Sequence, residues 1–103
     1  MEAIGTQLLF ENDQIRVWNL LLEPGQSAGI HQHQYPYIYI VLNKGETLMR
    51  ESDGNEVRQS DSRWQVVSHE AGLAHELINV GQTPYENIII EFKGAGVRHE
   101  RTL

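Results

Sequence analysis

Two histidines separated by a single residue are the first side chains in this sequence whose spacing could do chemistry. His31 and His33 stand in the segment Gly-Ile-His-Gln-His. Residues i and i+2 of a β-strand point to the same face, so on a strand the two imidazoles lie close enough to share one small ion. If that face points inward, the pair is a chelate. If it points outward, the pair is a polar patch in solvent, which is the more common situation for strand histidines.

A third histidine begins another strand-like segment farther along the chain. His75 follows Gly72 and opens the run HELIN, in which His75, Leu77 and Asn79 share one face. An imidazole on an inward, apolar face must be hydrogen-bonded or bind a ligand, because an unpaired buried polar group costs about 1–3 kcal/mol. Three neutral imidazoles on adjacent strands would bind a divalent Fe, Zn, Ni, Mn or Co ion and leave positions open for water or substrate.

The elements that must position these histidines are predicted to be short strands. Turn signals rich in Gly, Pro, Asn and Asp recur about every ten residues, and a spacing of roughly 8–12 residues is typical of an all-β sandwich or barrel. Between the turns, β-branched and aromatic residues predict strands. The predicted strands are residues 15–22, 37–42, 64–67, 75–80 and 85–92, with an Asp-Gly hairpin between 46–51 and 56–59. The run 37–42, YIYIVL, is apolar on both faces, which predicts one face inside a barrel and the other against a second sheet or a subunit.

Composition and charge exclude several classes of protein. The 103 residues are 40% apolar and contain no cysteine, so we expect a single domain over residues 1–103 without disulfides, thiolate nucleophiles or cysteine-type zinc sites. The formal net charge of −6 argues against nucleic acid as a partner, because phosphate binding needs clustered Lys and Arg. Only residues 93–101 lean basic. We expect a barrel core at about 10–93 and a polar, solvated tail at 94–103.

The N-terminal segment bears on localisation. It shows no apolar stretch of the kind found in signal peptides, and no apolar run approaches the ~20 residues that span a bilayer. We therefore expect a cytoplasmic protein with no membrane partner.

The glycine and histidine spacing resembles the two sequence motifs of the cupin superfamily. The first motif matches as G-x5-H-x-H at residues 25–33, with a glycine at position 45, and the second as G-x2-H-x3-N at residues 72–79. Within the superfamily, segments 10–18 and 79–84 look most like the small single-domain cupins of the β-alanine degradation protein type. The resemblance implies a cupin-type β-barrel, also called a double-stranded β-helix or jelly roll, of two packed antiparallel sheets. It also implies a metal ion in the barrel mouth and frequently a homodimer.

Carried over residue by residue, the resemblance makes His31, His33 and His75 the metal ligands and Asn79 a structural residue. The family's Glu ligand falls on Tyr37 or on Ile38, depending on the spacing, and neither is a carboxylate. A site with three neutral ligands leaves a divalent ion its full charge, which makes it a stronger Lewis acid.

A second departure lies in the other motif. Trp64 and Glu70 stand where that motif has a glycine and a proline, which puts the loop before the third histidine in doubt.

Three tyrosines alternate beside the first motif. Tyr35, Tyr37 and Tyr39 are expected to form barrel wall with phenol groups at its rim, while Gln32 and Gln34 face away from the site. The competing interpretation makes Tyr37 a catalytic residue that donates a hydrogen bond or a proton to a metal-bound substrate.

The remaining candidates have weaker support from the sequence. His69 and Glu70 are predicted to lie in an exposed loop, and His99 belongs to the tail. Glu91 and Trp18 lie in strand-like segments, where sheet packing or a dimer contact is the expected role.

The residues together indicate a metal-binding small cupin with a mononuclear three-His site. It would act on a small polar or anionic metabolite as a dioxygenase, isomerase or lyase, and the reaction type stays open. The alternative is a non-catalytic cupin that binds a small ligand or another protein, with a structural or absent metal. The expected partners are a small-molecule ligand and a second copy of the chain in a homodimer.

Overall fold

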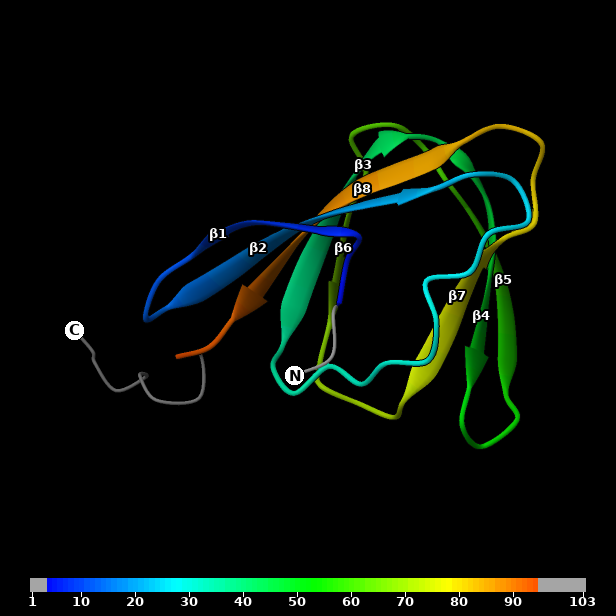
Figure 1. Cartoon of the computed structure of the whole chain (residues 1–103). Coiled ribbons are helices and arrows are strands. Elements are labelled where there is room, and N and C mark those ends of the chain that lie inside the picture. Colours follow the sequence, from blue (N-terminus) through cyan, green and yellow to red (C-terminus); the bar gives the residue numbers. More distant parts are fainter. Residues whose placement is uncertain (1–3, 95–103) are drawn as a thin grey trace.

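The computed structural model describes residues 4–94, and within them it contains eight β-strands and no helix (Figure 1). The strands are β1 (Gln7–Glu11), β2 (Ile15–Leu22), β3 (Tyr37–Asn43), β4 (Gly45–Glu51), β5 (Glu56–Asp61), β6 (Val66–His69), β7 (His75–Asn79) and β8 (Tyr85–Phe92). The all-β prediction is confirmed. Over the same residues no helix has the length and apolar character needed to cross a membrane.

The strands form two antiparallel sheets, as the resemblance implied. The larger sheet has the order β1-β2-β8-β3-β6, and the smaller has the order β5-β4-β7. Figure 1 shows the two sheets facing each other, with the segment between β2 and β3 running along β7. Isolated bridges between Ser27 and Ile78 and between His31 and His75 tie that segment to β7. It therefore extends the smaller sheet toward the open side of the barrel.

Strict alternation on β2 and β8 places the core between the sheets. Every second residue is buried along the whole of β8 and of β2. Leu22, Val41 and Tyr85 are at most 2% exposed, and burying a side chain of this size contributes about 1.5–3 kcal/mol. On β3, Tyr37 and Tyr39 are buried, whereas the alternating isoleucines are only partly buried. The inward face of the YIYIVL run is thus confirmed, and the cover of its outer face stays a prediction.

Asn79 closes the end of β7 with its side chain. It is fully buried, and its Nδ2 donates to the backbone oxygens of Leu22 (2.8 Å) and Thr83 (2.9 Å). Its Oδ1 accepts a hydrogen bond from the backbone N of Gly81 at 2.9 Å. Buried backbone groups must find partners, so this amide has the structural role that the resemblance implied.

Two strand predictions were incomplete or wrong. β1 was not predicted, because all five of its residues are exposed and QLLFE shows no alternation. The predicted strand 64–67 was displaced by two residues. It is Val66–His69 in the structure, because Trp64 has a φ of 70° and cannot continue a strand.

Trp64 occupies a turn position that favours glycine. The backbone N of Gln65 donates to the oxygen of Ser62 at 3.0 Å, and Trp64 is the third residue of that turn, where a positive φ is typical of type II. The indole is 62% exposed. The departure from the glycine of the second motif therefore leaves a bulky residue in a left-handed conformation, and the spacing to the third histidine is unchanged.

We predict that Trp64→Gly is more stable than Trp64→Ala by about 1 kcal/mol. Both variants lose the indole, but only glycine adopts the required φ without steric cost. At an ordinary strand position the alanine variant would instead be the more stable of the two. Urea unfolding of the two variants measures the difference. An alanine variant as stable as the glycine variant would show that this backbone is not under strain.

Candidate metal centre

The two histidines of the H-x-H pair lie between β2 and β3 and not on a regular strand. The i, i+2 argument assumed an extended backbone there; Gly25 and Gly29 have φ of 82° and 80°, and His31 pairs with β7 only through an isolated bridge. His31 is nevertheless anchored to β7 by a pair of backbone hydrogen bonds with His75, at 2.9 and 2.8 Å. His31 and His33 are each 4% exposed, so both point inward, whereas Gln32 and Gln34 are exposed, as expected.

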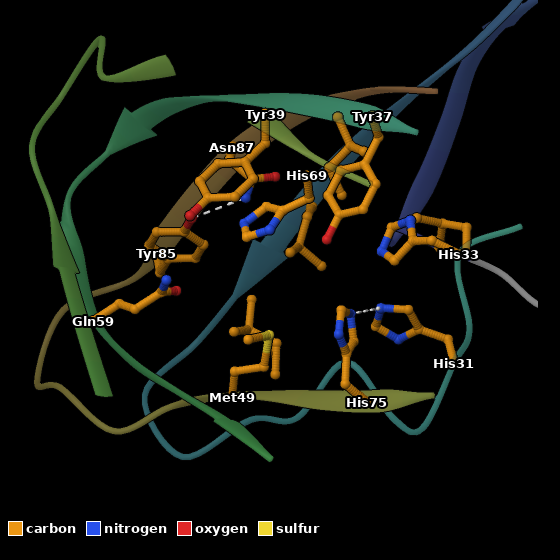
Figure 2. Close-up of a pocket in the computed structure, with 14 residues that line it drawn as sticks. His31, His33, Tyr37, Tyr39, Met49, Gln59, His69, His75, Tyr85 and Asn87 are labelled. Carbon is orange, nitrogen blue, oxygen red and sulfur yellow. Dashed lines mark hydrogen bonds between the residues drawn. The ribbon is translucent and has the colours of Figure 1, made fainter. Parts of the chain in front are cut away.

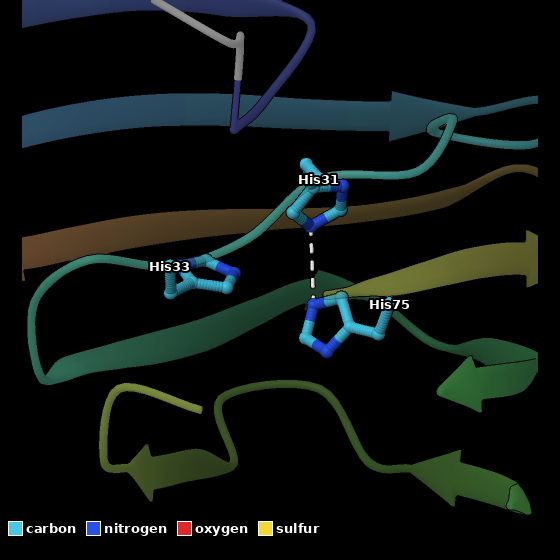
Figure 3. A group of neighbouring side chains, drawn as sticks. All are labelled: His31, His33 and His75. Carbon is cyan, nitrogen blue, oxygen red and sulfur yellow. Dashed lines mark hydrogen bonds between the residues drawn. The ribbon is translucent and has the colours of Figure 1, made fainter. Parts of the chain in front are cut away.

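The three predicted ligands come together at one place inside the barrel. One ring nitrogen from each of His31, His33 and His75 lies within 4.8 Å of the others. The ring centroids are 4.7 to 5.2 Å apart, and the rings meet edge to face (Figure 3). Imidazole nitrogens bind zinc at about 2.0–2.1 Å, which places two ligands of one ion no more than about 4 Å apart. The cluster therefore needs only small side-chain shifts to chelate one ion.

Hydrogen bonds determine which nitrogen carries the proton in the rings of His31 and His75. Nε2 of His31 and Nε2 of His75 are 3.1 Å apart, and Nδ1 of His31 lies 3.0 Å from the oxygen of Gly29. A carbonyl only accepts, so Nδ1 of His31 is the donor, and its Nε2 accepts from His75. The lone pair of His31 thus faces the cluster, and its other nitrogen is held by a carbonyl, which is the usual arrangement of a metal-binding histidine.

His75 is kept neutral by its surroundings. Burial lowers the pKa of its imidazole, and the neighbouring His31 and His33 lower it further, to about 4. A charged ring at this position would be poorly solvated and close to two other imidazoles. At neutral pH the ring is therefore uncharged, and a shift of its proton from Nε2 to Nδ1 would free a lone pair for an ion.

Tyr37 faces the histidine cluster. Its ring stacks on His33, with centroids 3.7 Å apart and planes 15° from parallel. Ile38 points to the opposite face of β3. Figure 2 shows the Tyr37 hydroxyl directed into the pocket. Burial raises the pKa of this phenol, and Glu51 and Glu91 raise it further, so the hydroxyl keeps its proton.

The histidines form one end of a pocket between the two sheets. The volume inside it that is open to a water-sized sphere is about 40 Å³, so the pocket is narrow. Beyond the histidines and tyrosines, the pocket is lined by the amides of Gln59 and Asn87 and by apolar residues such as Met49 and Ile89 (Figure 2). No Lys or Arg is among the described residues that line it. A negatively charged ligand would find no cationic side chain there.

His69 belongs to this pocket, and the prediction of an exposed loop was wrong for it. It ends β6 directly opposite Tyr37 in the sheet, and its ring is roughly parallel to those of Tyr37 and Tyr39, at 5.3 and 5.9 Å. The sequence offers little signal for this placement, because the displaced strand at 64–67 left residue 69 outside any element. Glu70 is exposed, as predicted.

Glu91 is a second residue whose place near the site was not predicted. It is completely buried on β8, where its Oε1 accepts hydrogen bonds from Nε of Arg16 (2.6 Å) and Nε1 of Trp18 (2.8 Å). Burial alone would raise the pKa of this carboxyl, but the nearby ring of His33, the hydrogen bonds from Arg16 and Trp18 and the guanidinium charge outweigh it and bring the pKa to about 2. The burial of Glu91 and Trp18 fits the sheet packing that was expected. Neither side chain is exposed enough to make the alternative, a dimer contact.

One candidate cannot be placed. His99, with the rest of the predicted tail after residue 94, lies outside the described residues.

Comparison with known proteins identifies the fold. No protein-family model matches the chain, and no curated protein sequence matches it. Among solved structures, a cupin domain from Bordetella pertussis matches with a TM-score of 0.79 and 24% identity, over 90% of this chain and 98% of that one. An RmlC-like cupin with a double-stranded β-helix fold from Methanocaldococcus jannaschii matches with a TM-score of 0.70 and 14% identity, over 84% and 76% of the two chains.

A third solved structure has a more specific description. It is a predicted oxalate decarboxylase from Thermotoga maritima, with a TM-score of 0.59 and 26% identity over 78% of this chain and 67% of that one. The chain therefore has the cupin fold, a double-stranded β-helix with a histidine cluster inside it. The resemblance to the β-alanine degradation type stays a prediction.

Proposed function

We propose that the chain binds one divalent metal ion through His31, His33 and His75 and uses it to bind and transform a small metabolite. The observation that supports this most directly is the convergence of three ring nitrogens within 4.8 Å inside the barrel. The donor set fits Zn, Fe, Ni, Co or Mn, all of which accept imidazole. A bound ion would supply Lewis acidity toward an oxygen of the ligand.

The residues around the cluster define what the chain itself contributes. The three imidazoles are neutral ligands, so no carboxylate among the ligands would offset the charge of the ion. The Tyr37 hydroxyl points into the same pocket and would donate a hydrogen bond to an oxygen of the ligand. Apolar side chains such as Met49 and Ile89 exclude water from the remaining wall.

The lining of the pocket narrows the class of ligand. Because no Lys or Arg lines it, a small anion would be held through the ion and Tyr37, and a polar molecule would also use the amides of Gln59 and Asn87. A small carboxylate that chelates metal fits both conditions. The name of the Thermotoga maritima neighbour supports oxalate as a first probe.

Metal analysis tests the proposal directly. We expect the protein to hold one ion per chain, either as purified without added metal or after reconstitution with zinc, iron, nickel, cobalt or manganese. Inductively coupled plasma mass spectrometry measures the metal content. Titration calorimetry of the metal-free protein should give the same stoichiometry. A chain that stays metal-free with all five ions would rule the proposal out in favour of a degenerate barrel.

A phenylalanine at position 37 separates ligand binding from metal binding. We predict that Tyr37→Phe weakens the binding of oxalate to the metal-loaded protein about tenfold, since a hydrogen bond to a charged group contributes about 1.5–3 kcal/mol. The metal affinity should stay the same, because Phe retains the stack on His33. Calorimetry measures both constants, and an unchanged oxalate affinity would leave Tyr37 as barrel wall only.

A further inference from the structure

Two buried polar atoms without hydrogen-bond partners face each other beside the cluster. They are Nδ1 of His33 and Oε2 of Glu91, which are 3.8 Å apart. Their side chains are 4% and 0% exposed, so bulk water does not reach them. Leaving such groups unpaired costs about 1–3 kcal/mol each, and a movement of less than about 1 Å would bring them to hydrogen-bond distance.

The carboxylate of Glu91 is held in this orientation from its other side. Oε1 accepts from both Arg16 and Trp18 of β2, which leaves Oε2 to point at the histidine. The ring of His33 is fixed in turn by its stack on Tyr37. Both partners are therefore constrained before any ion binds.

We propose that Glu91 is a positioning residue for His33. Its Oε2 holds the proton on Nδ1 of the imidazole, so the lone pair is on Nε2 and is available to an ion shared with His31 and His75. The Gly29 carbonyl does the same for Nδ1 of His31. A carboxylate in this place also makes the imidazole more basic, so that its Nε2 binds a metal ion more strongly. Loss of such a partner typically lowers metal affinity 10–100-fold. The effect on metal binding rests on the proposed function, whereas the position of the proton does not.

The experiment uses the full chain and two readouts. In the metal-free protein, nitrogen-15 NMR of the imidazoles should show His33 with its proton on Nδ1. In Arg16→Met/Glu91→Leu, which removes both charges and the acceptor, that preference should be lost. Zinc affinity, measured by competition with a chelator, should fall 10–100-fold in Glu91→Gln and in the double variant.

Controls keep these outcomes interpretable. Glu86→Gln changes a carboxylate on the other face of the same strand, where it bonds to Asn19, and it should leave zinc affinity unchanged. Circular dichroism establishes whether each variant is folded. If Glu91→Gln does not fold, the zinc affinity of the double variant provides the test. A proton on Nε2 of His33 in wild type, or zinc affinity within twofold of wild type in both variants, would overturn the proposal. A wild-type chain that binds none of the five metals would defeat the proposed function, while the NMR result would still decide the role of Glu91.

Discussion

Glu91→Gln is expected to lower the free energy of unfolding by about 3 kcal/mol at neutral pH. Arg16 is 5% exposed, and the substitution would leave its guanidinium in the interior without its carboxylate partner 2.6 Å away. Removing one member of a buried ion pair is costly because the other charge stays desolvated. Urea unfolding of wild type and variant at pH 7 gives the difference.

The same comparison should depend on pH in a definite direction. The pKa of Glu91 is about 2, below its ordinary value of 4.5, because its bonds and the guanidinium charge outweigh burial. Wild type therefore holds its full advantage over Glu91→Gln above about pH 4.5 and loses it as the pH falls toward 2. A difference that stays constant between pH 7 and pH 3 would show that the carboxylate charge is not the cause.

A matched substitution on the same strand gives the baseline. Glu86 accepts a hydrogen bond from Asn19 in a partly buried position, so Glu86→Gln should cost well under 1 kcal/mol.

Saturating zinc is expected to raise the melting temperature of wild type by roughly 10–20 °C, and His75→Ala should abolish most of that shift. A ligand at 100 times its dissociation constant stabilises the native state by about 2.7 kcal/mol. One kcal/mol corresponds to roughly 4–8 °C for a domain of this size. Loss of one of three nitrogen ligands leaves a two-ligand site of far lower affinity. Differential scanning fluorimetry with and without zinc measures the shift.

His69→Ala is the matched control for this result. His69 lines the same pocket but is outside the group of three nitrogens that lie within 4.8 Å. Its variant should keep the zinc shift. If His69→Ala loses the shift and His75→Ala keeps it, the ion binds somewhere other than the three-His cluster.

Much of the fold could be predicted because its central strands follow local rules. β2 and β8 have the predicted bounds, since long β-branched and aromatic runs between turn residues leave little choice of structure. The histidine triad could be predicted for a similar reason. The H-x-H spacing predicts both rings on one side, and the resemblance to the cupin motifs adds the third histidine, although glycines with positive φ make the segment irregular.

The features that could not be predicted depend on contacts between distant strands. β1 has no buried side and is defined only by its pairing with β2. Glu91 becomes important because the register sets it opposite Arg16, and a single acidic residue in an apolar run does not reveal that partner. His69 enters the pocket through its register with Tyr37, which a two-residue displacement of its strand concealed.

The segment between β2 and β3 has a consequence for local opening. It is fastened to β7 by backbone hydrogen bonds, among them Gly25 to Asn79 and Ala28 to Leu77, both at 2.8 Å. His31 and His75 are 44 residues apart in sequence, and in a chain without cysteine a shared ion would be a cross-link between them. Detachment of the segment would then require release of the ion. Amide hydrogen exchange along residues 25–33 would therefore measure the free energy of this local opening with and without metal.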